Sequence, residues 1–93
     1  MVRCVVEFYG VPRQLLALSQ KELELEDNAD LGKLLTYLVK TWPKLQGRVI
    51  TPEGDRLLPS YFMGINGRAS VSDLSTRINE GDHVLLMTAS AGG

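Results

Sequence analysis

One stripe of apolar residues at helical spacing does most to restrict the folds open to this chain. The stripe repeats at intervals of three and four residues and consists of Leu31, Leu34, Leu35, Leu38, Val39 and Trp42. That spacing predicts an amphipathic α-helix over residues 31–42, with one face to bury. Asn28 or Asp30 can cap its start, and Pro43 marks its end. We expect Trp42 to serve packing, so the rest of the chain must supply the surface that this face covers.

The remaining apolar segments predict strands. Residues 2–9 are rich in Val and aromatic residues, and alternation puts Val2, Cys4, Val6 and Phe8 on the core side. Residues 10–14 contain Gly and Pro and predict a turn, and a second strand is expected within residues 15–26. These two strands would form an antiparallel hairpin. Further strands are predicted at residues 61–66 and 83–87, with Asn66-Gly67 favouring a tight turn.

The other segments have weaker patterns. Residues 45–59 are expected to form a long connection that could include a short edge strand, and residues 71–74 suit either a short strand or a helical turn. Residues 79–82 predict a turn. The whole order predicts an α+β fold in which a mixed sheet is covered on one face by a single helix. The first and last strands are both strongly apolar, so we expect them to be central neighbours.

Composition excludes several classes of function. A chain of 93 residues makes one domain, and its 44% apolar and 23% charged residues are typical of a soluble globular protein. Basic and acidic residues are mixed and the net charge is −1, which argues against nucleic-acid binding and electrostatic membrane anchoring. No apolar stretch is long enough to span a membrane. We expect a cytoplasmic protein, with Cys4 as a small buried residue.

The C-terminal segment has a distinct composition. Residues 88–93 carry no charge and no large side chain, and they end in Gly92-Gly93. We expect residues 1–87 to form the domain and residues 88–93 a flexible tail. Because glycine lacks a Cβ atom, such an end can enter a slot that excludes other residue pairs. The chemistry available there is that of the Gly93 carboxylate: activation as an anhydride and capture by a nucleophile.

The element order together with this tail resembles the MoaD/ThiS family of ubiquitin-like β-grasp sulfur carriers. The resemblance covers essentially the whole chain. The segments that carry it are residues 2–9, the helix 31–42, Ile65-Asn66-Gly67-Arg68, the turn 79–84 and Ala91-Gly92-Gly93. It implies a β-grasp fold: a mixed sheet with one main helix on one face and a flexible Gly-Gly tail.

The resemblance also implies a function. An E1-like activating enzyme would use ATP to adenylate the Gly93 carboxylate, with Gly92 beside it, and a sulfur donor would then form the thiocarboxylate. The carrier would deliver this sulfur to an acceptor such as a molybdopterin synthase large subunit. The chain would not be an enzyme and would hold no cofactor of its own. It has no Gly-rich phosphate loop ending in Lys-Ser/Thr and no cluster of metal ligands in its sequence.

Strand alternation predicts where partners would bind. If Val84 and Leu86 face the core, then His83, Leu85 and Met87 point outward. Phe62 is expected to join them, and exposed apolar clusters of this kind mark interaction sites. We expect this patch, with Ala91 of the tail, to bind both the activating enzyme and the sulfur acceptor.

Two other functions remain open. A ubiquitin-like modifier would share the activation step but end in an isopeptide bond through Gly93. A non-catalytic β-grasp interaction module would have an incidental Gly-Gly end. The tail lacks the prolines of many molybdopterin-synthase small subunits and the arginines that precede Gly-Gly in ubiquitin. The client pathway therefore stays open among molybdenum cofactor, thiazole, cysteine, tRNA thiolation and protein modification.

Overall fold

The computed structural model describes residues 1–68 and 71–88, and its elements follow the predicted order with two added short helices, one near the N-terminus and one directly after the main helix. The elements in chain order are β1 (Val2–Phe8), α1 (Val11–Leu16), β2 (Gln20–Leu25), α2 (Leu31–Thr41), the 3-10 helix η1 (Pro43–Leu45), β3 (Tyr61–Ile65) and β4 (Asp82–Thr88). No helix within the described ranges is long and apolar enough to cross a membrane.

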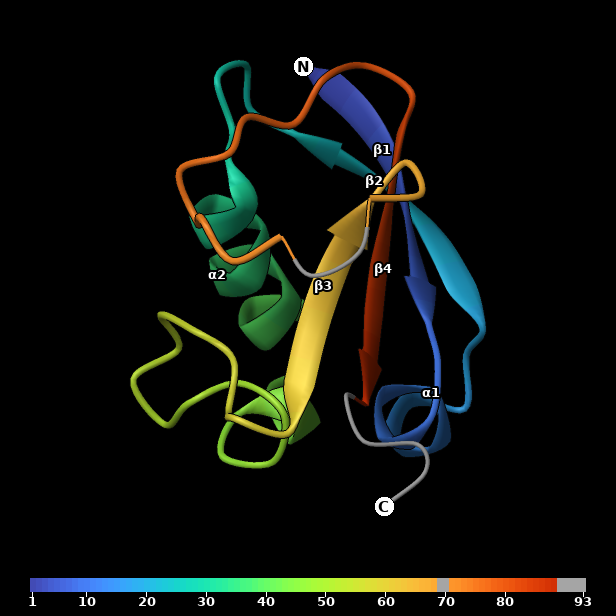
Figure 1. The fold of residues 1–93 in the computed structure, drawn as a ribbon, viewed down its shortest axis with the longest axis vertical. Helices are drawn as coiled ribbons and strands as arrows, with labels where there is room; N and C mark the ends of the chain where they lie inside the picture. The colour runs from blue at the N-terminus through green and yellow to red at the C-terminus, as the bar shows by residue number, and fades with distance from the viewer. Residues whose placement is uncertain (69–70, 89–93) are drawn as a thin grey trace.

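The four strands form one mixed sheet in the order β2-β1-β4-β3 (Figure 1). The central pair, β1 and β4, is parallel, and each of them has an antiparallel partner at the edge of the sheet. The prediction that the first and last strands are central neighbours is therefore confirmed. Because β1 and β4 run in the same direction, β4 finishes at the same end of the sheet at which β1 leads into α1.

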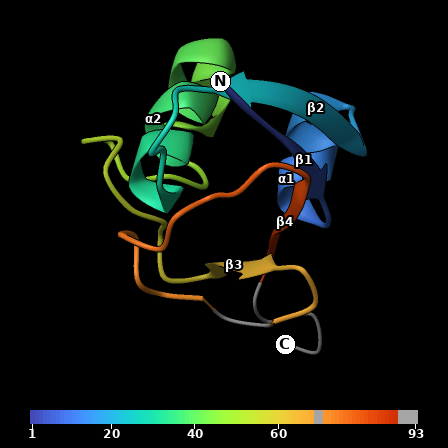
Figure 2. The ribbon, with the colours of Figure 1, turned by 90° about the horizontal axis from the view of Figure 1, so that it is seen from above.

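The core lies between the sheet and α2, which covers one face of the sheet (Figure 2). Cys4, Val6 and Phe8 are buried as the alternation of β1 predicted. From α2, the stripe buries Leu31, Leu34, Leu35 and Leu38, while Val39 and Trp42 pack against the core and stay partly exposed. Removal of this apolar area from water is the main favourable term for the fold.

The ends of α2 are defined by local contacts that the sequence indicated. Asp30 is the N-cap, and its carboxylate accepts a hydrogen bond from the Lys33 backbone N–H at 2.9 Å. The helix ends at Thr41, and the Trp42 ring packs edge-on against Phe8 with ring centroids 5.7 Å apart. The prediction that Trp42 serves packing is confirmed.

The predicted turn at residues 10–14 is wrong, although the predicted antiparallel pairing of the first two strands is confirmed. β1 and β2 do pair antiparallel, but the short helix α1 connects them. Pro12 lies in the first turn of α1, where a proline is tolerated because the helix needs no N–H donor there. The helix ends at Leu16, and its C-cap residue Ala17 has a φ of 52°, in the left-handed region.

The long connection before β3 carries part of the core. Leu45, Val49 and Ile50 are fully buried in it. In place of a short edge strand it has isolated β-bridges from Ile50 to Gln46 and Leu57. This segment therefore closes the core beside α2 without extending the sheet.

Candidate functional site

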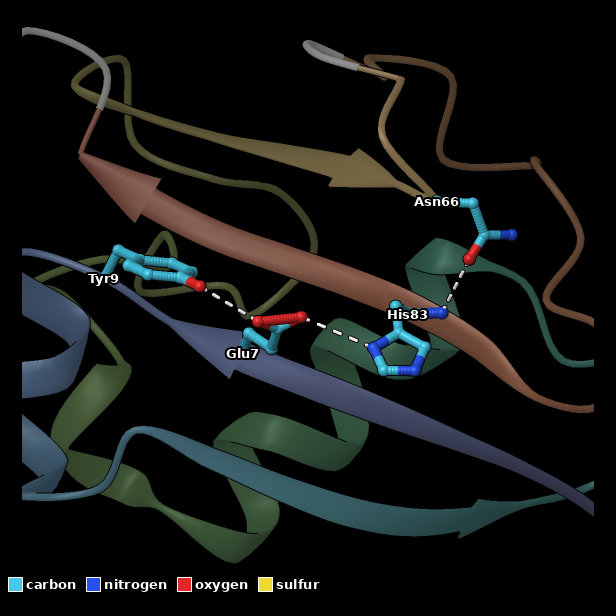
Figure 3. A network of polar contacts seen from close by, with 4 residues as sticks. All are labelled: Glu7, Tyr9, Asn66 and His83. Atoms are coloured by element: carbon cyan, nitrogen blue, oxygen red, sulfur yellow. Dashed lines mark hydrogen bonds and ion pairs between the residues drawn. The ribbon is translucent and has the colours of Figure 1, made fainter.

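The sheet face opposite α2 carries the side chains predicted to meet partners. Val84 and Leu86 of β4 are fully buried in the core. Strand alternation therefore turns His83, Leu85 and Met87 to the other side, and Figure 3 shows His83 in front of the sheet with α2 behind it. His83 is exposed, whereas Leu85 and Met87 are partly buried.

Strand register brings Phe62 and Glu7 to the same face. Phe62 of β3 is the partner of Met87, and it is also partly buried. Leu85 lies between Glu7 of β1 and Gly64 of β3. We call the set Glu7, Phe62, His83, Leu85 and Met87 the outer face. The structure thus brings together the four described residues predicted for the patch, while Ala91, Gly92 and Gly93 lie outside the described residues.

The Glu7 carboxylate organises the polar part of the outer face. The Tyr9 hydroxyl donates a hydrogen bond to it at 2.9 Å, and Nδ1 of His83 lies 3.4 Å from its other oxygen (Figure 3). This hydrogen bond to Glu7, together with the carboxylate charge, raises the pKa of Tyr9. Glu7 and Tyr9 have the outward parity of the first strand, but no local signal in the sequence marked them as part of this face.

A buried carboxylate anchors the start of β4. Asp82 accepts hydrogen bonds from the Asn66 side chain at 2.9 Å and from the Asn79 backbone N–H at 2.8 Å. The Asn66 side-chain oxygen in turn accepts from the His83 backbone N–H at 2.8 Å. Asn66 and Gly67 both have positive φ, as a type I′ turn requires. The turn after β3 is thereby joined to the first residues of β4.

The other end of β4 is tied to α1. Thr88, the last described residue, accepts a hydrogen bond at its hydroxyl from the Val11 backbone N–H at 3.1 Å. The Tyr9 backbone N–H donates to the Leu86 carbonyl at 3.0 Å, which extends the β1–β4 ladder. β4 thus continues one residue into the segment expected to be tail. No local pattern in the sequence indicated the Thr88–Val11 contact.

Three hollows in the described part of the chain have linings that include no residue of β4. One, of about 550 Å³, is between β2 and α2 and is lined by Leu25 and Tyr37 among others. A second, of about 530 Å³, lies beside α1 and η1. The third, of about 230 Å³, includes Phe62 in its lining and therefore lies next to the end of β4, because Phe62 pairs with Met87. Within residues 1–68 and 71–88, no three His, Cys, Asp or Glu side chains gather closely enough to hold a metal ion.

Solved structures with this fold are similar over nearly the whole chain. SAMP1 from Haloferax volcanii is 22% identical with a TM-score of 0.82, covering 98% of this chain and 99% of its own. The putative molybdopterin converting factor subunit 1 from Pyrococcus furiosus is 22% identical with a TM-score of 0.77, covering 95% and 98%. Urm1 from Trypanosoma brucei is 21% identical with a TM-score of 0.76, covering 98% and 95%. No curated protein matches the sequence.

The sheet order, the covering helix and these neighbours define a ubiquitin-like β-grasp protein. The predicted fold class is confirmed. The model of the ThiS family matches residues 6–93, and the chain belongs to that family.

Proposed function

We propose that this protein is a sulfur carrier that acts through the carboxylate of Gly93. Membership of the ThiS family over residues 6–93 is the observation that carries the proposal. The fold supports it, because β4 is held between two strands and leads directly toward residues 89–93. Gly92 and Gly93 make the end thin enough to enter a narrow site in a partner.

The proposed chemistry needs a partner because a carboxylate is a poor electrophile. A carboxylate oxygen of Gly93 attacks the α-phosphorus of ATP in the activating enzyme, and pyrophosphate leaves. Hydrosulfide, or a donor at the same oxidation level, then attacks the acyl carbon, and AMP leaves with the bonding electron pair. The product is a thiocarboxylate, which passes its sulfur to an acceptor enzyme. ATP-dependent activation suits the cytoplasm, and this chain supplies the acyl group instead of acting as the enzyme.

The outer face is the surface that we propose for both partners. Phe62, Leu85 and Met87 are adjacent through strand register and only partly buried. Apolar side chains gathered on a surface favour association, and Met adapts its shape to different partners. The Glu7 carboxylate beside Leu85 adds a charge that can select a basic group on the partner. We propose that Ala91 takes part in the same contact. The acceptor enzyme, such as a molybdopterin synthase large subunit, would bind the same face.

Intact mass spectrometry tests the proposed function. The protein is incubated with ATP, sulfide and an E1-like activating enzyme from the same cell. We expect a mass gain equal to the difference between sulfur and oxygen, because one carboxylate oxygen is replaced. Deleting Gly93 should abolish the gain while the variant stays folded. A wild-type mass that does not change with any activating enzyme would refute the sulfur-carrier proposal.

A modifier role is the second candidate, and the name of a structural neighbour favours it. That neighbour, from Methanosarcina acetivorans, is the small archaeal modifier protein 1. A modifier would use the same adenylate, but a lysine amine would attack the acyl carbon in place of sulfur. In lysate we would then see conjugates of higher mass that require Gly93. A plain interaction module would instead keep its function when Gly92 and Gly93 are deleted.

A further inference from the structure

The first turn of α1 takes its capping group from the far end of the chain. The N-cap residue is Gly10, which has no side chain to accept a hydrogen bond from the helix. The Thr88 hydroxyl takes this place and accepts from the Val11 N–H at 3.1 Å, across 77 positions in sequence. Unpaired N–H groups at a helix start are costly when they are shielded from water, so the contact stabilises both elements.

Glycine at position 10 leaves room for this contact. Its φ is +67°, a conformation that residues with a Cβ atom rarely adopt. A Cβ atom built there would lie 2.6 Å from the Thr88 hydroxyl oxygen and 3.2 Å from the Thr88 Cβ. The bend after β1 and the end of β4 are thus fitted to one another at van der Waals distance.

Thr88 is also the point from which residues 89–93 extend. Thr88 pairs with Tyr61 of β3, and the nearby Tyr9–Leu86 hydrogen bond extends the β1–β4 ladder. Residues 89–93 begin at Thr88, so the hydrogen bond from Val11 helps to fix the point and the direction in which this segment leaves the domain. A misplacement of about 1 Å at a reacting group can cost about a hundredfold in rate.

We propose that Thr88 is a positioning residue: its hydrogen bond to α1 fixes where and in which direction residues 89–93 leave the domain, and so how readily the Gly93 carboxylate reaches the activating enzyme. This inference rests on the proposed function, since it concerns the adenylation of Gly93. It assigns to α1 the task of orienting the end of β4.

The test compares Thr88→Val with Thr88→Ser in adenylation by the activating enzyme. Valine keeps the shape and strand preference but leaves the Val11 N–H without its acceptor, whereas serine keeps the hydroxyl. We expect Thr88→Val to lower kcat for pyrophosphate release about three- to tenfold with KM for the carrier unchanged. Thr88→Ser should restore most of the rate. Amide exchange at Val11 should accelerate in the valine variant only.

Two control variants separate positioning from stability and from docking. Ile78→Val removes a methyl group from the core near the other end of β4, and it should lower stability without lowering kcat. Leu85→Lys alters the outer face and should raise KM. Thr88 points to the same side of the sheet as Leu86, away from the outer face, so its effect should be confined to kcat.

The outcomes for the inference and for the proposed function are distinct. If the wild-type chain is adenylated and Thr88→Val reacts equally fast, the positioning role is wrong while the carrier function stands. If Ile78→Val lowers kcat as much as Thr88→Val does, the effect comes from stability and the positioning role is again wrong. A wild-type chain that no activating enzyme adenylates would overturn the proposed function and the inference together.

Discussion

At the scale of single residues, Asp82 shows how a buried charge can organise two turns. It is 8% exposed, and its two carboxylate oxygens accept hydrogen bonds from the Asn66 side chain and the Asn79 backbone. Because Asn66 also accepts from the His83 N–H, one small network aligns the turn after β3 with the start of β4. These hydrogen bonds compensate the Asp82 carboxylate for the contacts with water that it loses on burial.

Asp82→Ala should lower the free energy of unfolding by about 1–3 kcal/mol, because the Asn66 and Asn79 donors lose their acceptor. Urea denaturation would show this as a lower midpoint with an unchanged slope. Glu53→Ala, which removes an exposed carboxylate, is the control and should change stability by less than about 0.5 kcal/mol. Equal midpoints for the two variants would contradict the structural role of Asp82.

The Cys4 thiol should make the free energy of unfolding depend on pH in the alkaline range. Burial, with a smaller contribution from the Asp82 charge, raises the pKa of the Cys4 thiol from 9.0 to about 11. The unfolded chain therefore releases this proton at lower pH than the folded chain, so stability should fall as the pH rises between those values. Urea unfolding of wild type and Cys4→Ala across this range isolates the thiol. A pH dependence that is the same in both proteins would contradict the prediction.

At the scale of elements, the two α-helices show what local sequence can and cannot predict. α2 was predicted because its buried stripe and its Asp30 cap are both local signals. α1 was missed because its six residues are too few for a periodic pattern, and because its capping group is Thr88 at the other end of the chain. A proline in the first turn of α1 then resembled a strand breaker.

Strand β4 carries a prediction about the outer face. Leu85→Asp places a second carboxylate beside Glu7, so it should lower stability by about 0.2–1 kcal/mol as well as weaken binding to the activating enzyme. Leu85→Lys should weaken binding without that loss, because a lysine faces Glu7 favourably. Calorimetric titration and thermal unfolding measure the two effects separately. Unchanged affinity in both variants would exclude the outer face as the docking surface.

At the scale of the whole molecule, the sequence predicted the layers better than the contacts between them. Alternation within two strands was enough to place Phe62 of one strand and His83, Leu85 and Met87 of the other on one face. The contact of His83 with Glu7, whose carboxylate also accepts from Tyr9, depends on the register between β1 and β4, which lie far apart in sequence. No local pattern specifies such a register. For the same reason the burial of Val49 and Ile50 in an irregular segment was not foreseen.

A chain truncated after Thr88 should unfold at the same temperature as the full chain. The reason is that the buried apolar residues of the described chain all lie at or before Leu86, and both ladders of β4 end by Thr88. Scanning calorimetry on the two proteins checks this. Adenylation would be lost in the truncated protein, since Gly93 is absent. A marked fall in the unfolding temperature would instead give residues 89–93 a structural role.

The central place of β4 has a mechanical consequence. The strand is paired at five positions with β1 on one side and at five with β3 on the other. A pull applied beyond Thr88 along the strand axis loads both ladders in shear, so their hydrogen bonds must yield together. A strand at the sheet edge would resist the same pull with only one ladder. A partner that draws the C-terminal segment into its own site would therefore move the whole domain without unfolding it.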